Sequence, residues 1–92
     1  MKYPSRVVLK LPLSQNADLS AFVEDCIVSG VVLIAVWGKN AVAIEDELDW
    51  LIIADKRPEE QWIVTTSHSA QEDALGFAER WLPEDKFAVV RL

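Results

Sequence analysis

The sequence is short of cysteine and of basic charge, and both shortages narrow what the protein can be. Cys26 is the single cysteine and His68 the single histidine among 92 residues, so neither an internal disulfide nor a zinc site is expected. The 9 Lys and Arg residues are scattered and stand against 15 Asp and Glu residues, which gives a net charge of −6. Because binding a polyanion usually takes a basic patch, we expect no nucleic-acid partner.

Cofactor motifs, a secretion signal and long apolar runs are also missing. Neither G-x-G-x-x-G nor G-x-x-x-x-G-K-[ST] occurs, so no nucleotide cofactor is expected. The longest apolar run, residues 31–37, is too short to cross a bilayer, and the first residues lack the apolar core of a signal peptide. These absences, together with the lone cysteine, favour a cytoplasmic protein that neither spans nor binds a membrane.

What the sequence does contain is a regular alternation of strand and helix patterns. With 51% hydrophobic residues, residues 1–92 fit one globular domain. Strands are expected at residues 6–11, 31–37, 61–66 and 86–92, and helices at about 19–29, 41–55 and 70–82. Asp18, Asn40 and Ser69 are the expected N-caps, the last through a capping box with Glu72.

The order βαβαβαβ predicts an α/β fold. Parallel strands need crossover connections, so we expect a four-stranded, mostly parallel sheet in a three-layer, Rossmann-like or flavodoxin-like sandwich. The strand order 2-1-3-4 is favoured because it places helices on both faces of the sheet. The order 3-2-1-4 stays open, because residues 31–37 are continuously apolar, as in a strand buried on both faces.

In such sheets ligands bind beyond the carboxyl ends of the strands, which points to two loops. The candidate ligand-binding residues, after the second and third strands, are Gly38, Lys39, Asn40, Thr65, Thr66, Ser67 and His68. His68 is the one side chain suited to proton transfer near neutral pH. Adjacency of Ser67 and His68 does not make them a nucleophile and its base, because sequence neighbours rarely point at each other. We assign no catalytic residue and expect a protein without enzymatic activity.

The second helix carries a group of acidic residues and an apolar pair outside its core stripe. The acidic group, Glu45, Asp46, Glu47 and Asp49, is compatible with a hard-cation site, but a solvated helix face is favoured because Mg²⁺ and Ca²⁺ usually need more converging oxygens. Trp50 and Ile53 lie on a different side from the expected core stripe of Ile44, Leu48, Leu51 and Ile52. This pair predicts an interface, with a two-fold homodimer as the expected arrangement.

One set of motifs resembles a known family. Ser29-Gly30 precedes an apolar strand that ends in Trp37-Gly38, an acidic helix follows, and a later strand ends in Thr65-Thr66-Ser67-His68. This pattern, over residues 6–80, resembles a family of small bacterial α/β domains of unknown function. The chain departs from the family pattern at Ala41 and Ser67, where a polar or Cys residue and an aromatic residue are usual. The resemblance marks Trp37-Gly38 and Thr65-Thr66-His68 for testing and implies no chemistry.

Two functions from different classes are therefore open. A non-enzymatic protein-interaction module fits the missing catalytic motifs, the acidic surface and the 4 Trp residues. The alternative is a small-ligand or anion-binding domain that uses the crevice at the carboxyl ends of the second and third strands.

Overall fold

The chain forms four strands and three helices in the predicted order. A computed structural model describes residues 2–15, 17–54, 63–80 and 87–92. The elements are β1 (Arg6–Lys10), α1 (Leu19–Ser29), β2 (Leu33–Trp37), α2 (Ala41–Ala54), β3 (Val64–His68), α3 (Gln71–Arg80) and β4 (Phe87–Val90). The expected starts of the third and fourth strands at residues 61 and 86, and the expected helix ends at 55 and 82, lie outside the described residues. Within the described residues, no helix combines the length and apolar character needed to cross a membrane.

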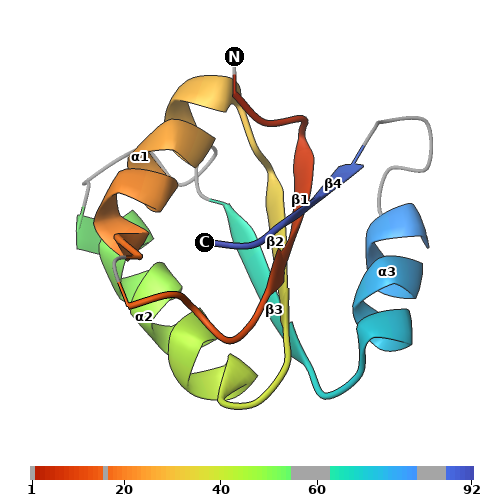
Figure 1. The fold of residues 1–92 in the computed structure, drawn as a ribbon. Helices are drawn as coiled ribbons and strands as arrows, with labels where there is room; N and C mark the ends of the chain where they lie inside the picture. The colour runs from red at the N-terminus through yellow and green to blue at the C-terminus, as the bar shows by residue number, and fades with distance from the viewer. Residues whose placement is uncertain (1, 16, 55–62, 81–86) are drawn as a thin grey trace.

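The sheet is parallel throughout, with the strand order β3-β2-β1-β4. The favoured order 2-1-3-4 is therefore wrong, and the alternative 3-2-1-4 is confirmed. Residues 33–36 of β2 are buried, as their continuous apolar character requires of a central strand. The connections from β1 to β2 and from β2 to β3 move in one direction across the sheet, and the connection from β3 to β4 moves back in the other direction. As a result, α1 and α2 cover one face of the sheet and α3 covers the other (Figure 1).

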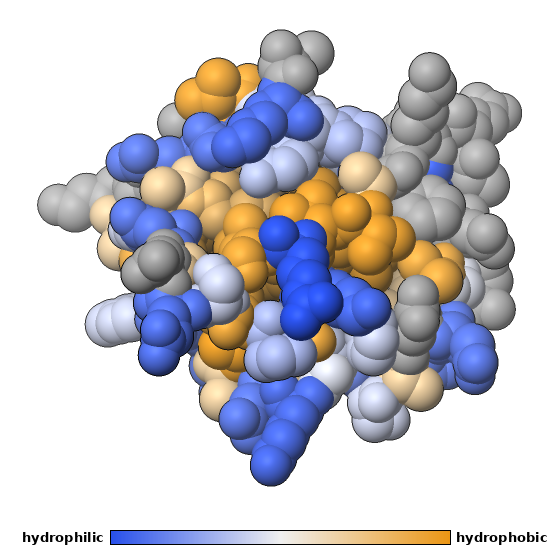
Figure 2. Space-filling model, in the orientation of Figure 1, coloured by the Kyte–Doolittle hydropathy of each residue, from blue (hydrophilic) through white to orange (hydrophobic). Residues whose placement is uncertain are grey.

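The larger core lies between the sheet and the α1–α2 layer. Its buried members include Val7, Leu9, Phe22, Cys26, Ile34, Val36, Leu48 and Ile52. Ile44 and Leu51 are partly buried against the same cluster, so the predicted core stripe of the second helix is confirmed. A smaller cluster of Val8, Leu33, Ala35 and Ala74 lies under α3. On the face drawn in Figure 2, apolar side chains gather over the middle of the molecule, where β1 and β4 lie.

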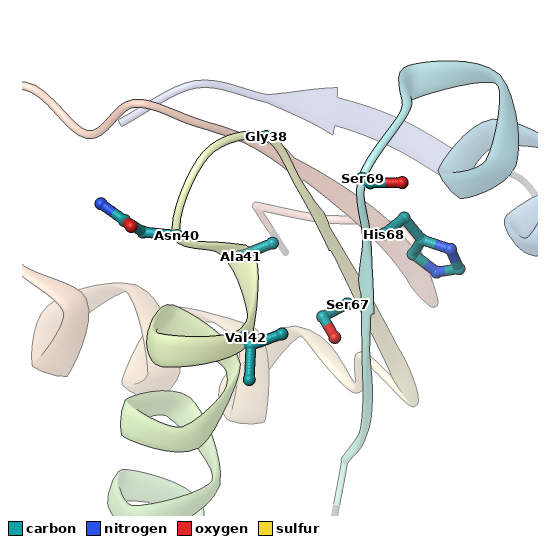
Figure 3. Close-up of a pocket in the computed structure, with 7 residues that line it drawn as sticks. All are labelled: Gly38, Asn40, Ala41, Val42, Ser67, His68 and Ser69. Atoms are coloured by element: carbon teal, nitrogen blue, oxygen red, sulfur yellow. The ribbon is translucent and has the colours of Figure 1, made fainter.

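Helix ends follow the predicted capping only in part. The Asp18 carboxylate accepts a hydrogen bond from the Ala21 amide (3.1 Å), and Gly30 closes α1 in the left-handed region with φ 79°, so both predicted caps of α1 are confirmed. Asn40 was expected to be the N-cap of α2. Instead, its backbone is left-handed (φ 67°), and its side chain points away from the helix (Figure 3). At α3 the Ala70 carbonyl accepts the first helical bond, from Ala74, so this helix begins one residue later than the capping box predicts.

Candidate functional site

The loops after β2 and β3 meet at the carboxyl end of the sheet. Trp37 and His68 are paired in register at the ends of these strands, and the Gly38 amide donates a hydrogen bond to the His68 carbonyl oxygen (3.3 Å). β3 runs to His68, two residues beyond its predicted end at Thr66, because Ser67 pairs in register with Val36 as a strand residue. Ser67 and His68 therefore belong to the strand and not to the loop in which they were expected.

A pocket of about 240 Å³ opens where α2 begins beside the end of β3 (Figure 3). It is lined by Gly38, Asn40, Ala41, Val42, Ser67, His68 and Ser69. Four of these residues, Gly38, Asn40, Ser67 and His68, were candidates from the sequence. Ala41 and Val42 escaped sequence reasoning, since apolar residues at a helix start carry no local sign of lining a pocket.

The polar groups of this pocket come from β3 and from the start of α2. Ser67 projects toward α2, whereas His68 and Ser69 project from the opposite side of the strand (Figure 3). The amides of a first helical turn have no partner within the helix itself and carry partial positive charge. At α2 the Ala41 amide donates to the Gly38 carbonyl (3.2 Å). The groups able to bind a small polar or anionic ligand here are the Ser67 hydroxyl and the backbone amides that follow Ala41 in the first turn of α2.

On the α3 side of the sheet, His68 belongs to a row of three paired side chains. Lys10, Trp37 and His68 are in register across β1, β2 and β3, and the Lys10 Nζ lies 5.4 Å from the centre of the Trp37 ring. The Thr66 Oγ1 lies 2.9 Å from the His68 Nε2. The Trp37 Nε1 is buried and has no hydrogen-bond partner among the described residues. Thr66 and His68 thus contact each other, as alternation along a strand allows, while Ser67 faces the other way.

Thr65 lies outside the pocket and instead contacts the acidic group of α2. Its Oγ1 is 3.1 Å from the Glu45 Oε2 and also within hydrogen-bond reach of the Asp49 Oδ1. Asp46 and Glu47 are exposed, as a solvated face requires, so the acidic group divides into an inner pair and an outer pair. The i, i+4 spacing of Glu45 and Asp49 is the sequence signal that could have identified this inner pair. In the part of the chain that the structure describes, no three His, Cys, Asp or Glu side chains gather to hold a metal ion.

The outer face of α2 is the second surface to consider. Trp50 is 72% exposed, Ile53 48% and Val42 65%. Residues 42, 46, 50 and 53 recur at i, i+4, i+8 and i+11, which places them along one side of a 3.6-residue helix. We call Val42, Asp46, Trp50 and Ile53 the α2 stripe. It begins at Val42, which also lines the pocket, so the two surfaces are continuous.

Neither Lys39 nor Cys26 contributes to these surfaces. Lys39 is exposed in the turn between β2 and α2 and does not line the pocket. Cys26 is fully buried in the larger core, where loss of hydration, with a smaller contribution from the Asp25 carboxylate, raises the pKa of its thiol to about 12. The thiol therefore stays protonated and inert at neutral pH.

Comparison with protein families covers most of the chain. A family model described as a domain of unknown function, DUF7684, matches residues 6–89. No curated protein and no solved structure matches the chain.

Proposed function

The chain belongs to the DUF7684 family, whose function is unknown, and we propose that it is a protein-interaction module that binds its partner through the α2 stripe. The observation that carries this proposal is the exposure of Trp50, 72% of whose surface is open to solvent in the folded domain. A large apolar side chain left in water forgoes the favourable free energy that its burial would give. Such side chains are the usual anchors of protein interfaces.

The residues around Trp50 indicate that it belongs to a larger contact surface and is not an isolated exposed side chain. Val42 and Ile53 lie on the same side of the helix and are also exposed. The opposite side of α2 is fixed to the core by Leu48 and Ile52, so the stripe is held on a rigid element. A rigid helix face loses little conformational entropy when it binds, which favours recognition.

Site-directed photo-crosslinking tests this function. Trp50 is replaced by p-benzoylphenylalanine in the full chain, and the protein is irradiated in the cells that produce it. Val28 is the matched control position, because it is an apolar residue that is 76% exposed on α1. We expect a discrete adduct from position 50 and none from position 28. No adduct at position 50, or the same adducts at both positions, would contradict the proposal.

The pocket favours a second candidate function, the binding of a small polar or anionic ligand. Its volume of about 240 Å³ is large enough to admit a phosphate or a carboxylate group and lies below the usual range for drug-sized ligands. A titration of the ¹⁵N-labelled protein with inorganic phosphate and with acetate tests it. Binding should shift the amides of Gly38, Val42 and Ser67, and Ser67→Ala should weaken it. Shifts confined to the opposite end of the sheet, around Arg6 and Leu33, would reject this candidate.

A further inference from the structure

The charges on α2 narrow the kind of partner that the α2 stripe can bind. The helix carries four acidic residues, Glu45, Asp46, Glu47 and Asp49, and no basic one. Asp46 and Glu47 are exposed, and neither has an ion-pair partner among the residues that the structure describes. Asp46 lies within the stripe, between Val42 and Trp50. Any partner that covers Trp50 therefore also covers, or closely approaches, the Asp46 carboxylate.

A covered carboxylate needs a cationic partner. Removing a charge from water is unfavourable unless hydrogen bonds and an opposite charge replace its hydration. A second copy of this chain does not supply that charge from the same helix face. In a two-fold dimer the same surface meets itself, so each copy would bring the acidic residues of α2, and no basic residue of that helix, to the interface. Each copy also carries a net charge of −6, which opposes association at long range.

We propose, as a deepening of the proposed function on which it rests, that the α2 stripe binds an arginine-bearing amphipathic segment of another protein. Asp46 and Trp50 are four residues apart, on neighbouring turns of one helix side. An arginine placed between them can pair with the Asp46 carboxylate through both guanidinium nitrogens while its plane lies on the Trp50 indole. A lysine offers a point charge without the flat, forked group, so it satisfies this pair less well.

The length of the stripe sets the length of the partner. Residues 42 to 53 advance by about 16 Å along the helix axis, which a partner helix of about three turns would cover. Apolar side chains at helical spacing would lie on Trp50 and Ile53, with basic side chains toward Asp46 and Glu47. The other acidic residues of α2, Glu45 and Asp49, favour the same orientation by attraction at longer range.

Three synthetic 14-residue amphipathic peptides test the proposal. They share one leucine stripe and carry arginine, lysine or glutamate at the polar positions. Binding to the full-length, ¹⁵N-labelled chain is followed through the indole N–H signal of Trp50, which is identified by its loss in Trp50→Phe. We expect the arginine peptide to bind more tightly than the lysine peptide by roughly threefold or more, and the glutamate peptide not to bind. Equal affinity for the arginine and lysine peptides would overturn the role given to arginine.

Matched variants separate a specific site from attraction to an acidic protein in general. Trp50→Ala should weaken the arginine peptide at least about tenfold, and Asp46→Asn about fivefold. Glu72→Gln removes the same charge from an exposed position on α3 and should change the affinity less than about twofold. Equal losses in Asp46→Asn and Glu72→Gln would overturn the proposal.

Failure of this inference can be told apart from failure of the proposed function. If sedimentation at tens of micromolar shows a dimer that Trp50→Ala dissociates, the stripe binds a second copy. The partner class is then wrong, while the interaction module stands. If position 50 gives no photo-adduct, the proposed function fails whatever the peptides do.

Discussion

Gly38 packs directly against Leu11, so closely that a methyl group added to its Cα would lie 2.9 Å from the Leu11 Cβ. The Leu11 amide also donates a hydrogen bond to the Trp37 carbonyl (3.0 Å), which holds the ends of β1 and β2 together just before the turn. Gly38 has a φ of 121°, a conformation that side chains with a Cβ rarely adopt. The turn that leads from β2 into α2, and hence part of the lining of the pocket, depends on a residue without a side chain.

Gly38→Ala should destabilise the fold by about 2–5 kcal/mol, because backbone strain and the overlap with Leu11 add together. Gly30→Ala is the matched control. Gly30 also has a positive φ, 79°, but nothing lies within 4 Å of an added Cβ, so about 1 kcal/mol is expected from strain alone. Urea unfolding followed by circular dichroism measures both. Equal losses in the two variants would show that the contact with Leu11 is unimportant.

Thr65→Val should destabilise the protein by about 1–3 kcal/mol, because it removes a half-buried hydroxyl that donates a hydrogen bond to a carboxylate. The Glu45 carboxylate lies 3.1 Å from that hydroxyl and the Asp49 carboxylate within hydrogen-bond reach, so the single hydroxyl proton can bond to either, and its loss removes a donor from this acidic pair. Thr66→Val changes the same atoms on the other face of β3, where the hydroxyl contacts the His68 ring and no carboxylate among the described residues. A smaller loss is expected there, measured by urea unfolding. The reverse ranking would contradict the interpretation.

Ser29→Ala should cost about 1–3 kcal/mol, because the buried Ser29 hydroxyl oxygen accepts hydrogen bonds from the Lys2 and Tyr3 amides (3.1 and 3.2 Å). These bonds fix the N-terminal segment against the end of α1. Ser20→Ala, an exposed change on the same helix, should stay within about 0.5 kcal/mol. Hydrogen exchange provides an independent measurement, since the two amides should exchange faster only in Ser29→Ala.

Stability should fall with rising pH above pH 9 because of Cys26. Burial raises the pKa of its thiol from 9.0 to about 12, so the folded state favours the neutral form. Below pH 9 the thiol is protonated in both states and its stabilising contribution is complete. Above pH 9 the unfolded chain ionises first, and the free energy of unfolding falls by up to about 1.4 kcal/mol per pH unit until the folded pKa is reached.

Cys26→Ala is the control for this pH dependence, since it keeps every other group that titrates in the same range. Its unfolding free energy, measured from pH 8 to 11, should fall less steeply than that of the wild type. Iodoacetamide at pH 7.5 provides a second measurement, because the buried thiol should react only after unfolding. Parallel pH curves for the two proteins, or rapid alkylation of the folded wild type, would contradict the assignment.

Much of the fold could be predicted because local sequence patterns, such as hydrophobic periods and capping residues, specify its elements. The period of Leu19, Phe22, Val23 and Cys26 specifies the buried side of α1, and Asp18 and Gly30 mark its ends. The continuous apolar run of β2 indicates a strand covered on both faces, and this kept the observed order 3-2-1-4 open, although the order 2-1-3-4, with β2 at an edge, was favoured. The exposed positions of Trp50 and Ile53 followed in the same way, from their place outside the core stripe of α2.

The sequence alone therefore determined the elements, their parallel connection and the end of the sheet where a crevice forms. Only the tertiary structure decided the strand order and the extension of β3 to His68, which gives Ser67 and His68 the opposite directions of neighbouring strand residues. It also placed Arg6, 2% exposed at the start of β1, inside the protein. Helix and strand periods arise from residues that are neighbours within one chain segment, so the sequence of that segment is enough to reveal them. Strand order and register arise from hydrogen bonds between segments far apart in the chain, which no local pattern encodes.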